Sequence, residues 1–180
     1  MNKLYRFFVM IVLLLAALLL IAGTSAAERA ESPYRYTTFM AKCAEYPPEE
    51  VWETDQVLHI RGLITTGQTF GDPYFAGTFE NRTDIDLNMV TGKGHARGTV
   101  YIMPDAYDGT WEGGHFSGPI RNFMFSGRGI DYGTGELEGL KDIVRVQEID
   151  PSELPPEYEN PCNGDPVLGA FFAIGKIVGK

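Results

Sequence analysis

The chain has few cysteines, few histidines and few basic residues for its acidic content. Its 180 residues include 2 Cys and 3 His, and 15 Lys and Arg stand against 24 Asp and Glu, which gives a formal net charge of −9 at pH 7. An acidic surface repels phosphate backbones and anionic lipid headgroups, so we expect no nucleic-acid partner. The sequence also lacks a nucleotide-binding loop, a metal-ligand spacing and a Ser-His-Asp order, so we expect no cofactor and no metal.

Long apolar runs are absent except at the N-terminus. Lys3 and Arg6 precede an unbroken apolar segment from Phe7 to Ala22, and small residues follow up to Ala27. This order is typical of a signal peptide, so residues 1–27 are expected to be cleaved and the protein exported (secreted, periplasmic or at the cell surface) without a stable membrane span. The alternative is an uncleaved anchor helix, because the run is close to the lower length limit for a span.

The two cysteines lie on either side of the glycine-rich middle of the chain. In an oxidising compartment Cys43 and Cys162 are expected to form a disulfide that ties the N-terminal arm to the C-terminal segment. Two free thiols, or two metal ligands, are the alternatives.

Glycine and proline divide the exported chain into three zones. Residues 28–55 and 150–180 contain most of the prolines and are predicted to be irregular arms, the first with a short helix around 49–52. Residues 56–149 contain most of the 21 glycines and are predicted to form the folded domain. The apolar tail 167–178 is expected to pack on this domain as a strand or short helix, with an oligomer contact or a lid as the alternative.

Short runs of alternating apolar and polar residues fill the glycine-rich zone. They predict strands, which are listed here: 57–64, 74–81, 84–90, 95–103, 109–117, 120–127 and 135–146. Turns are expected at 81–84, 91–92, 105–109 and 131–133, and a bulge near Gly139. The fold class is therefore all-β, a closed or nearly closed up-and-down antiparallel barrel of about eight strands, because closure removes vulnerable sheet edges. A two-sheet sandwich is the competing architecture.

Three glycine-containing motifs carry a family resemblance. Gly109-Thr-Trp-Glu-Gly, Phe116-Ser-Gly and the run from Gly129 to Leu140 resemble the repeating style of the allene-oxide-cyclase-like and dirigent-like β-barrels, including exported bacterial relatives. The resemblance covers roughly residues 56–148. It implies an eight-stranded barrel with an apolar cavity that binds a hydrophobic small molecule or steers a reactive intermediate. No catalytic motif of either group matches numbered positions of this chain.

Several polar residues are candidates for a site. His-x-Arg pairs at 59/61 and 95/97 each place two side chains on one face of a strand, where they would hold an anion or simply face solvent. Three histidines could meet in a zinc site, but their spacing resembles no metal signature. Glu136 and Glu138 could act as a glycosidase pair, and a solvent-exposed pair is the simpler interpretation of these glutamates. The candidate ligand-contacting residues are listed here: Arg97, Tyr101, Glu112 and His115. Aromatic residues such as Trp111 are expected in the core or the cavity wall.

Two functions from different classes follow from this architecture. The first is a noncatalytic exported barrel that binds a small apolar or amphipathic ligand or serves as a surface interaction module. The alternative is a cyclase- or isomerase-like enzyme that works mostly by confining a hydrophobic substrate, with polar groups that orient it. The inward-facing residues of the barrel distinguish the two.

Overall fold

The computed structural model describes residues 33–158 and 161–179, which all belong to one compact unit. The predicted signal peptide, residues 1–27, lies outside the described residues. Among these residues there is no α-helix, and no helix long and apolar enough to cross a membrane. The nine strands are listed here: β1 Tyr34–Tyr46, β2 Glu50–Thr54, β3 Val57–Gly71, β4 Gly77–Asn88, β5 Lys93–Pro104, β6 Trp111–Arg121, β7 Met124–Gly133, β8 Lys141–Ile149 and β9 Gly169–Val178.

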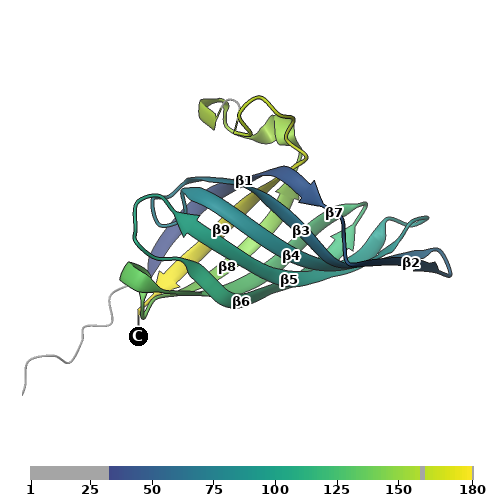
Figure 1. Ribbon diagram of the computed structural model, residues 1–180, viewed down its shortest axis with the longest axis horizontal. Coiled ribbons are helices and arrows are strands. Elements are labelled where there is room, and N and C mark those ends of the chain that lie inside the picture. Colours follow the sequence, from purple (N-terminus) through teal and green to yellow (C-terminus); the bar gives the residue numbers. More distant parts are fainter. Residues whose placement is uncertain (1–32, 159–160, 180) are drawn as a thin grey trace, which may run out of the picture. The chain divides into compact units, whose positions relative to one another are not determined.

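Eight of the strands form a closed antiparallel barrel (Figure 1). From β3 to β9 each strand pairs with the next strand in the chain, and β1 joins the two edges by pairing with both β9 and β3. β2 is an additional strand that pairs with the first residues of β3 and extends one end of the barrel. The predicted up-and-down barrel is confirmed, and the sandwich alternative is excluded.

Alternation along the strands, interrupted by register shifts at a few positions, separates the barrel interior from its surface. Along β5, Ala96 and Ile102 are buried, whereas His95 and Arg97, the two neighbours of Ala96, are exposed. Successive side chains of a strand point to opposite faces, so each strand contributes one row to the interior and one to solvent. The core therefore lies inside the barrel.

One predicted turn does not exist. Strand β4 runs without interruption, in continuous register with β5 from Gly77↔Pro104 to Asn88↔Lys93, where we predicted two strands separated by a turn at 81–84. Asn81 and Thr83 face the barrel interior, and the Thr83 hydroxyl donates to Asn81 Oδ1 at 2.9 Å. Polar residues inside a strand resemble a turn in the sequence, which explains why a turn was wrongly predicted at 81–84.

Both predicted arms contribute strands to the barrel. β1 and β9 lie outside the predicted 56–149 range, and the predicted helix around 49–52 is wrong because β2 occupies that position. The inward row of β1 mixes Tyr36, Thr38, Met40 and Lys42, so its apolar period is weak in the sequence. β9 occupies most of the tail 167–178, which was expected to pack on the barrel as a strand or short helix. Its oligomer contact stays a prediction.

The predicted turn at 131–133 and the predicted bulge near Gly139 are both displaced. β7 continues to Gly133, and the connection to β8 covers 134–140, where a 3₁₀ helix spans Gly135–Leu137. Gly139, with φ +91°, lies in this connection rather than inside a strand. Asp131 is therefore a strand residue, which matters for the site described below.

The predicted disulfide is present. Cys43 of β1 is bonded to Cys162, with a Cα–Cα distance of 5.2 Å. It attaches the segment between β8 and β9, which contains the 3₁₀ helices Pro151–Glu153 and Pro156–Tyr158, to the barrel wall (Figure 1). Tyr158 of this segment stacks on Phe70 of β3, with ring centroids 4.8 Å apart. The C-terminal segment thus packs on the barrel, as expected.

Candidate functional site: the barrel cavity

A cavity of about 270 Å³ occupies the barrel interior. This volume lies just below the roughly 300 Å³ at which sites for drug-sized ligands begin, so the space suits a small molecule. Its wall is mostly apolar, with residues from opposite sides of the barrel such as Phe79, Val100, Phe116, Val144 and Ala173. Trp111 lies in the core and Phe116, Phe123 and Phe125 line the cavity, as the sequence predicts, whereas Tyr132, for which the same was expected, is 47% exposed.

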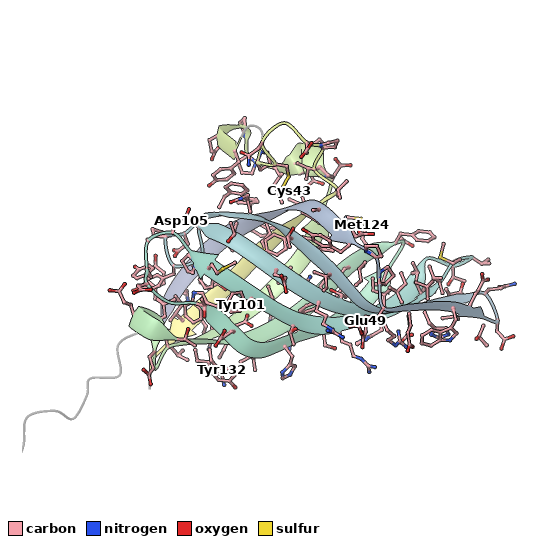
Figure 2. The ribbon with its side chains drawn as sticks, in the orientation of Figure 1. Cys43, Glu49, Tyr101, Asp105, Met124 and Tyr132 are labelled. Atoms are coloured by element: carbon pink, nitrogen blue, oxygen red, sulfur yellow. A yellow bond between two sulfur atoms is a disulfide. The ribbon has the colours of Figure 1, made fainter. Side chains whose placement is uncertain are left out.

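One end of the cavity is closed by packed aromatic rings. Phe75, from the loop between β3 and β4, stacks on Tyr36 with centroids 4.1 Å apart and on Trp111 with centroids 5.2 Å apart. Trp111 donates its indole N–H to the Tyr74 carbonyl at 2.7 Å. These rings are almost completely buried, since Phe75 and Trp111 are at most 1% exposed. The same end carries Asp105 and Tyr132 on its surface (Figure 2).

The opposite end of the cavity reaches the surface. Phe123, in the turn between β6 and β7, lines the cavity and is 52% exposed. Lys42 and Glu148 also line this part, and Lys42 forms an ion pair with Glu45 at 2.9 Å. Met124 and Glu49 mark this end in Figure 2. A ligand entering here would pass two charged side chains before it met the apolar wall.

Two buried carboxyl groups form part of the wall near the closed end. Asp131 of β7 and Asp142 of β8 are directly opposite each other in the antiparallel register, and they are only 2% and 1% exposed. Tyr36 of β1 donates its hydroxyl to Asp142 Oδ2 at 2.7 Å. Among the residues that the structure describes, the Oδ1 atom of each Asp has no hydrogen-bond partner. Unsatisfied buried acceptors are costly, so this cluster is a candidate site.

The environment of the pair changes its protonation. Desolvation by burial raises the pKa of Asp131 to about 7. Desolvation also raises the pKa of Asp142 to about 7, with the nearby Asp131 acting in the same direction and the Tyr36 hydrogen bond opposing it. The pKa of Tyr36 is raised as well, first by burial and then by Asp142, so this phenol stays protonated and acts as a donor. The pair therefore exchanges protons near neutral pH.

Two glycines make room for this cluster. A Cβ on Gly114 of β6 would collide with the Ile130 carbonyl group and would also lie 2.6 Å from Asp131 Oδ1, and a Cβ on Gly175 of β9 would collide with the Tyr36 ring. Side chains at these positions would displace the carboxyl group or the phenol. Part of the glycine content of the barrel is thus explained by the space that the cluster occupies.

The four candidate residues from the sequence are not part of the cavity wall. Arg97 and His115 are exposed on the outer surface, and Arg97 lies 3.8 Å from Asp84 Oδ2. Tyr101 and Glu112 are half-buried, and neither they nor the other two are among the lining residues. The structure brings none of them together around the cavity. Tyr101, which Figure 2 labels, lies toward the C-terminal end of β5.

The other pairs considered from the sequence have local partners. His59 and Arg61 both contact Asp86 Oδ1, each at 2.6 Å, and Trp52 stacks on His59, so both side chains of this His-x-Arg pair already have partners on the protein. Glu136 accepts from the Asp108 backbone N–H at 3.0 Å and stabilises a loop. Within residues 33–158 and 161–179, no group of three or more His, Cys, Asp or Glu is arranged to hold a metal ion.

The sequence reasoning missed the carboxyl pair, although one signal was available. Asp142 alternates with Val144 and Val146, so it lies on the apolar face of its strand. An acidic residue in phase with a buried row marks an unusual buried charge. Asp131 carried no comparable signal, because its neighbours Tyr132 and Gly133 resemble a turn.

In comparisons with protein-family models, with curated proteins and with solved structures, no match to this chain was found. The closed eight-stranded antiparallel barrel that the resemblance implied is present, and membership of the allene-oxide-cyclase-like or dirigent-like group stays a prediction.

Proposed function

We propose that the barrel binds a small amphipathic molecule in its cavity, with the apolar part against the wall and a polar end at the carboxyl pair. The observation that carries this proposal is a mostly apolar cavity of about 270 Å³ that also holds convergent polar groups from three strands, Tyr36, Asp131 and Asp142. Binding sites typically combine an apolar wall with a few placed polar groups.

Two further features support an exported barrel that binds a hydrophobic molecule. The Cys43–Cys162 disulfide fits an exported protein, because disulfides persist in oxidising compartments. The barrel architecture also fits the proposed relationship to allene-oxide-cyclase-like and dirigent-like proteins, in which such barrels hold hydrophobic molecules.

A cavity-filling variant tests the proposal. Ala173 of β9 is 2% exposed and lines the cavity, whereas its neighbour Ile174 is 51% exposed on the outer surface. Isothermal titration with 2-phenylethanol should detect binding to the wild type, and Ala173→Leu should weaken it by about tenfold or more because the added atoms occupy the site. The control Ile174→Phe adds volume outside and should bind normally. Equal binding by Ala173→Leu would contradict the proposal.

A second candidate is an isomerase- or cyclase-like enzyme. The specific observation is that the pKa values of Asp131 and Asp142 are raised to about 7, which suits proton transfer near neutral pH. A direct test is the isomerisation of 3-cyclohexen-1-one to its conjugated isomer, followed by ultraviolet absorbance. Acceleration that disappears in Asp142→Asn would favour the enzyme. A wild-type rate equal to the buffer rate for this probe favours a binding protein.

A further inference from the structure

The carboxyl pair lacks a positively charged partner. Among the described residues, neither Asp131 nor Asp142 takes part in an ion pair, and the single side-chain donor to the pair is the Tyr36 hydroxyl. The titratable groups that act on the cluster are the two aspartates, Tyr36, and Asp72 through its effect on Tyr36. All of these groups are neutral or negative, so an ionised carboxylate has no nearby positive charge, and on Asp142 only the hydrogen bonds from the Tyr36 hydroxyl and the Ile143 backbone favour its ionised form.

The unsatisfied atoms define what a ligand must supply. Among the described residues, two acceptor atoms have no hydrogen-bond partner, Oδ1 of Asp131 and Oδ1 of Asp142. Asp131 is 2% exposed and Asp142 is 1% exposed. An anionic ligand would be repelled, and a neutral alcohol offers one donor for two acceptors. A protonated primary amine offers three donors and the missing positive charge. Hydrogen bonds between ionised partners are also the stronger kind.

A metal ion is a poorer match than an organic cation. Two carboxylates and one phenol supply few oxygen ligands, whereas Ca²⁺ takes about six to eight and Mg²⁺ needs about six. Most of the remaining cavity wall is apolar and partly aromatic, with Phe79 and Phe116 among its residues. That wall suits the hydrocarbon part of an organic molecule.

We propose that the cavity binds a small primary amine, with its ammonium group held by Asp131 and Asp142 and its compact apolar body against the aromatic wall. This inference rests on the proposed binding function and specifies the chemical class of the ligand. The Tyr36 hydroxyl keeps Asp142 Oδ2 occupied, which leaves the Oδ1 atoms for the ammonium. Glu148 and Lys42 at the open end are not needed for this contact.

Amine binding is linked to the protonation of the pair. Without a ligand the pair holds protons near neutrality, since burial raises both pKa values to about 7. The ammonium favours the ionised carboxylates, so binding displaces protons. A primary amine stays protonated to about pH 10. Its affinity should therefore rise as the pH rises through about 7, whereas the affinity of a neutral alcohol should stay constant.

Three probes with the same aromatic body test the proposal by isothermal titration. At about pH 8 the wild type should bind 2-phenylethylamine at least about tenfold more tightly than 2-phenylethanol, and 3-phenylpropionate should bind weakest. Asp131→Asn and Asp142→Asn should each remove this preference while alcohol binding persists. The control Asp105→Asn changes an exposed loop carboxylate and should behave as the wild type. Lowering the pH to about 5.5 should weaken amine binding alone.

The outcomes separate this inference from the proposed function. Alcohol binding that equals or exceeds amine binding in the wild type overturns the amine class and leaves the binding function intact. Failure of all three probes to bind the folded wild type overturns both. If an Asn variant does not fold by circular dichroism, the wild-type pH series decides, and an amine affinity that does not change with pH overturns the proposal.

Discussion

At the scale of single residues, the unusual feature is a pair of carboxyl groups inside an otherwise apolar barrel. Asp131 of β7 and Asp142 of β8 are register partners on neighbouring strands, and their burial favours the protonated form of both carboxyl groups. Such a pair reduces stability when it ionises, and the ligand that we propose for it would compensate this cost. Functional groups commonly carry a cost of this kind.

The stability of the protein should depend on the protonation of this pair. Because the folded-state pKa values lie above those of the unfolded chain, the folded state binds more protons between about pH 4 and 7, and stability falls as the pH rises through this window. Asp142→Asn removes one ionisable group and keeps an acceptor for Tyr36. We expect it to be more stable than the wild type by roughly 1–3 kcal/mol at about pH 8.

Urea denaturation at several pH values measures this effect. The advantage of Asp142→Asn should shrink toward about pH 4, where the wild-type carboxyl group is protonated. Asp105→Asn, in an exposed loop, should show no such pH-dependent advantage. A wild type that is at least as stable as Asp142→Asn at about pH 8 would be incompatible with burial of an unpaired carboxyl group.

At the scale of elements, close packing between strands positions the cluster. Tyr36 of β1 reaches Asp142 of β8 across β9, because Gly175 of β9 has no side chain under the phenol ring. The interior of the wall is therefore shaped by glycine on one strand and by a tyrosine on the next. The Tyr36 ring and a side chain at position 175 could not both occupy this part of the interior.

A methyl group at Gly175 should disturb this arrangement. The Cβ of Gly175→Ala would collide with Tyr36, so we expect a loss of about 1–3 kcal/mol from overpacking and a weaker Tyr36–Asp142 contact. Gly179→Ala is the matched control, since its Cβ meets nothing within 4 Å. Thermal unfolding by circular dichroism measures both. Unchanged stability in Gly175→Ala would show that Tyr36 is not held where the structure places it.

The sequence indicates the strands in the middle of the chain, although not their exact bounds, and it misses the strands at its two ends, β1 and β9. β5 is predictable because Ala96 and Ile102 alternate with exposed polar residues, whereas β1 is hidden because Thr38 and Lys42 share its inward row with Tyr36. The site depends on cross-barrel neighbours: Tyr36 and Asp142 are 106 positions apart in the chain. No local sequence pattern indicates this contact, because it forms only when the barrel closes and brings the two strands close together.

At the scale of the whole molecule, β1 closes the barrel and the disulfide secures the segment that leads into β9. β1 pairs with both β3 and β9, and Cys43 on β1 is bonded to Cys162, which is 119 positions away. Bringing together residues that are far apart in the chain costs conformational entropy. The covalent link and the strand pairing therefore stabilise the same closure.

Removal of the disulfide should weaken the entire barrel. The double variant Cys43→Ser, Cys162→Ser should lose about 2–5 kcal/mol, because the unfolded chain is no longer constrained across a long loop. Thermal unfolding with and without a reducing agent measures this loss. The reducing agent should lower the melting temperature of the wild type and leave that of the double variant unchanged. A reducing agent that leaves both unchanged would contradict a stabilising role.

The central claim, that the barrel interior receives a ligand, is tested most directly by methyl nuclear magnetic resonance during titration with 2-phenylethanol. Ile85, Val144 and Ala173 line the cavity, whereas Val51 and Ile174 are exposed on the outer surface. The account predicts chemical-shift changes confined to the inward methyl groups, with one saturable affinity. Changes at Val51 and Ile174 alone, or no saturable change at any methyl group, would contradict it.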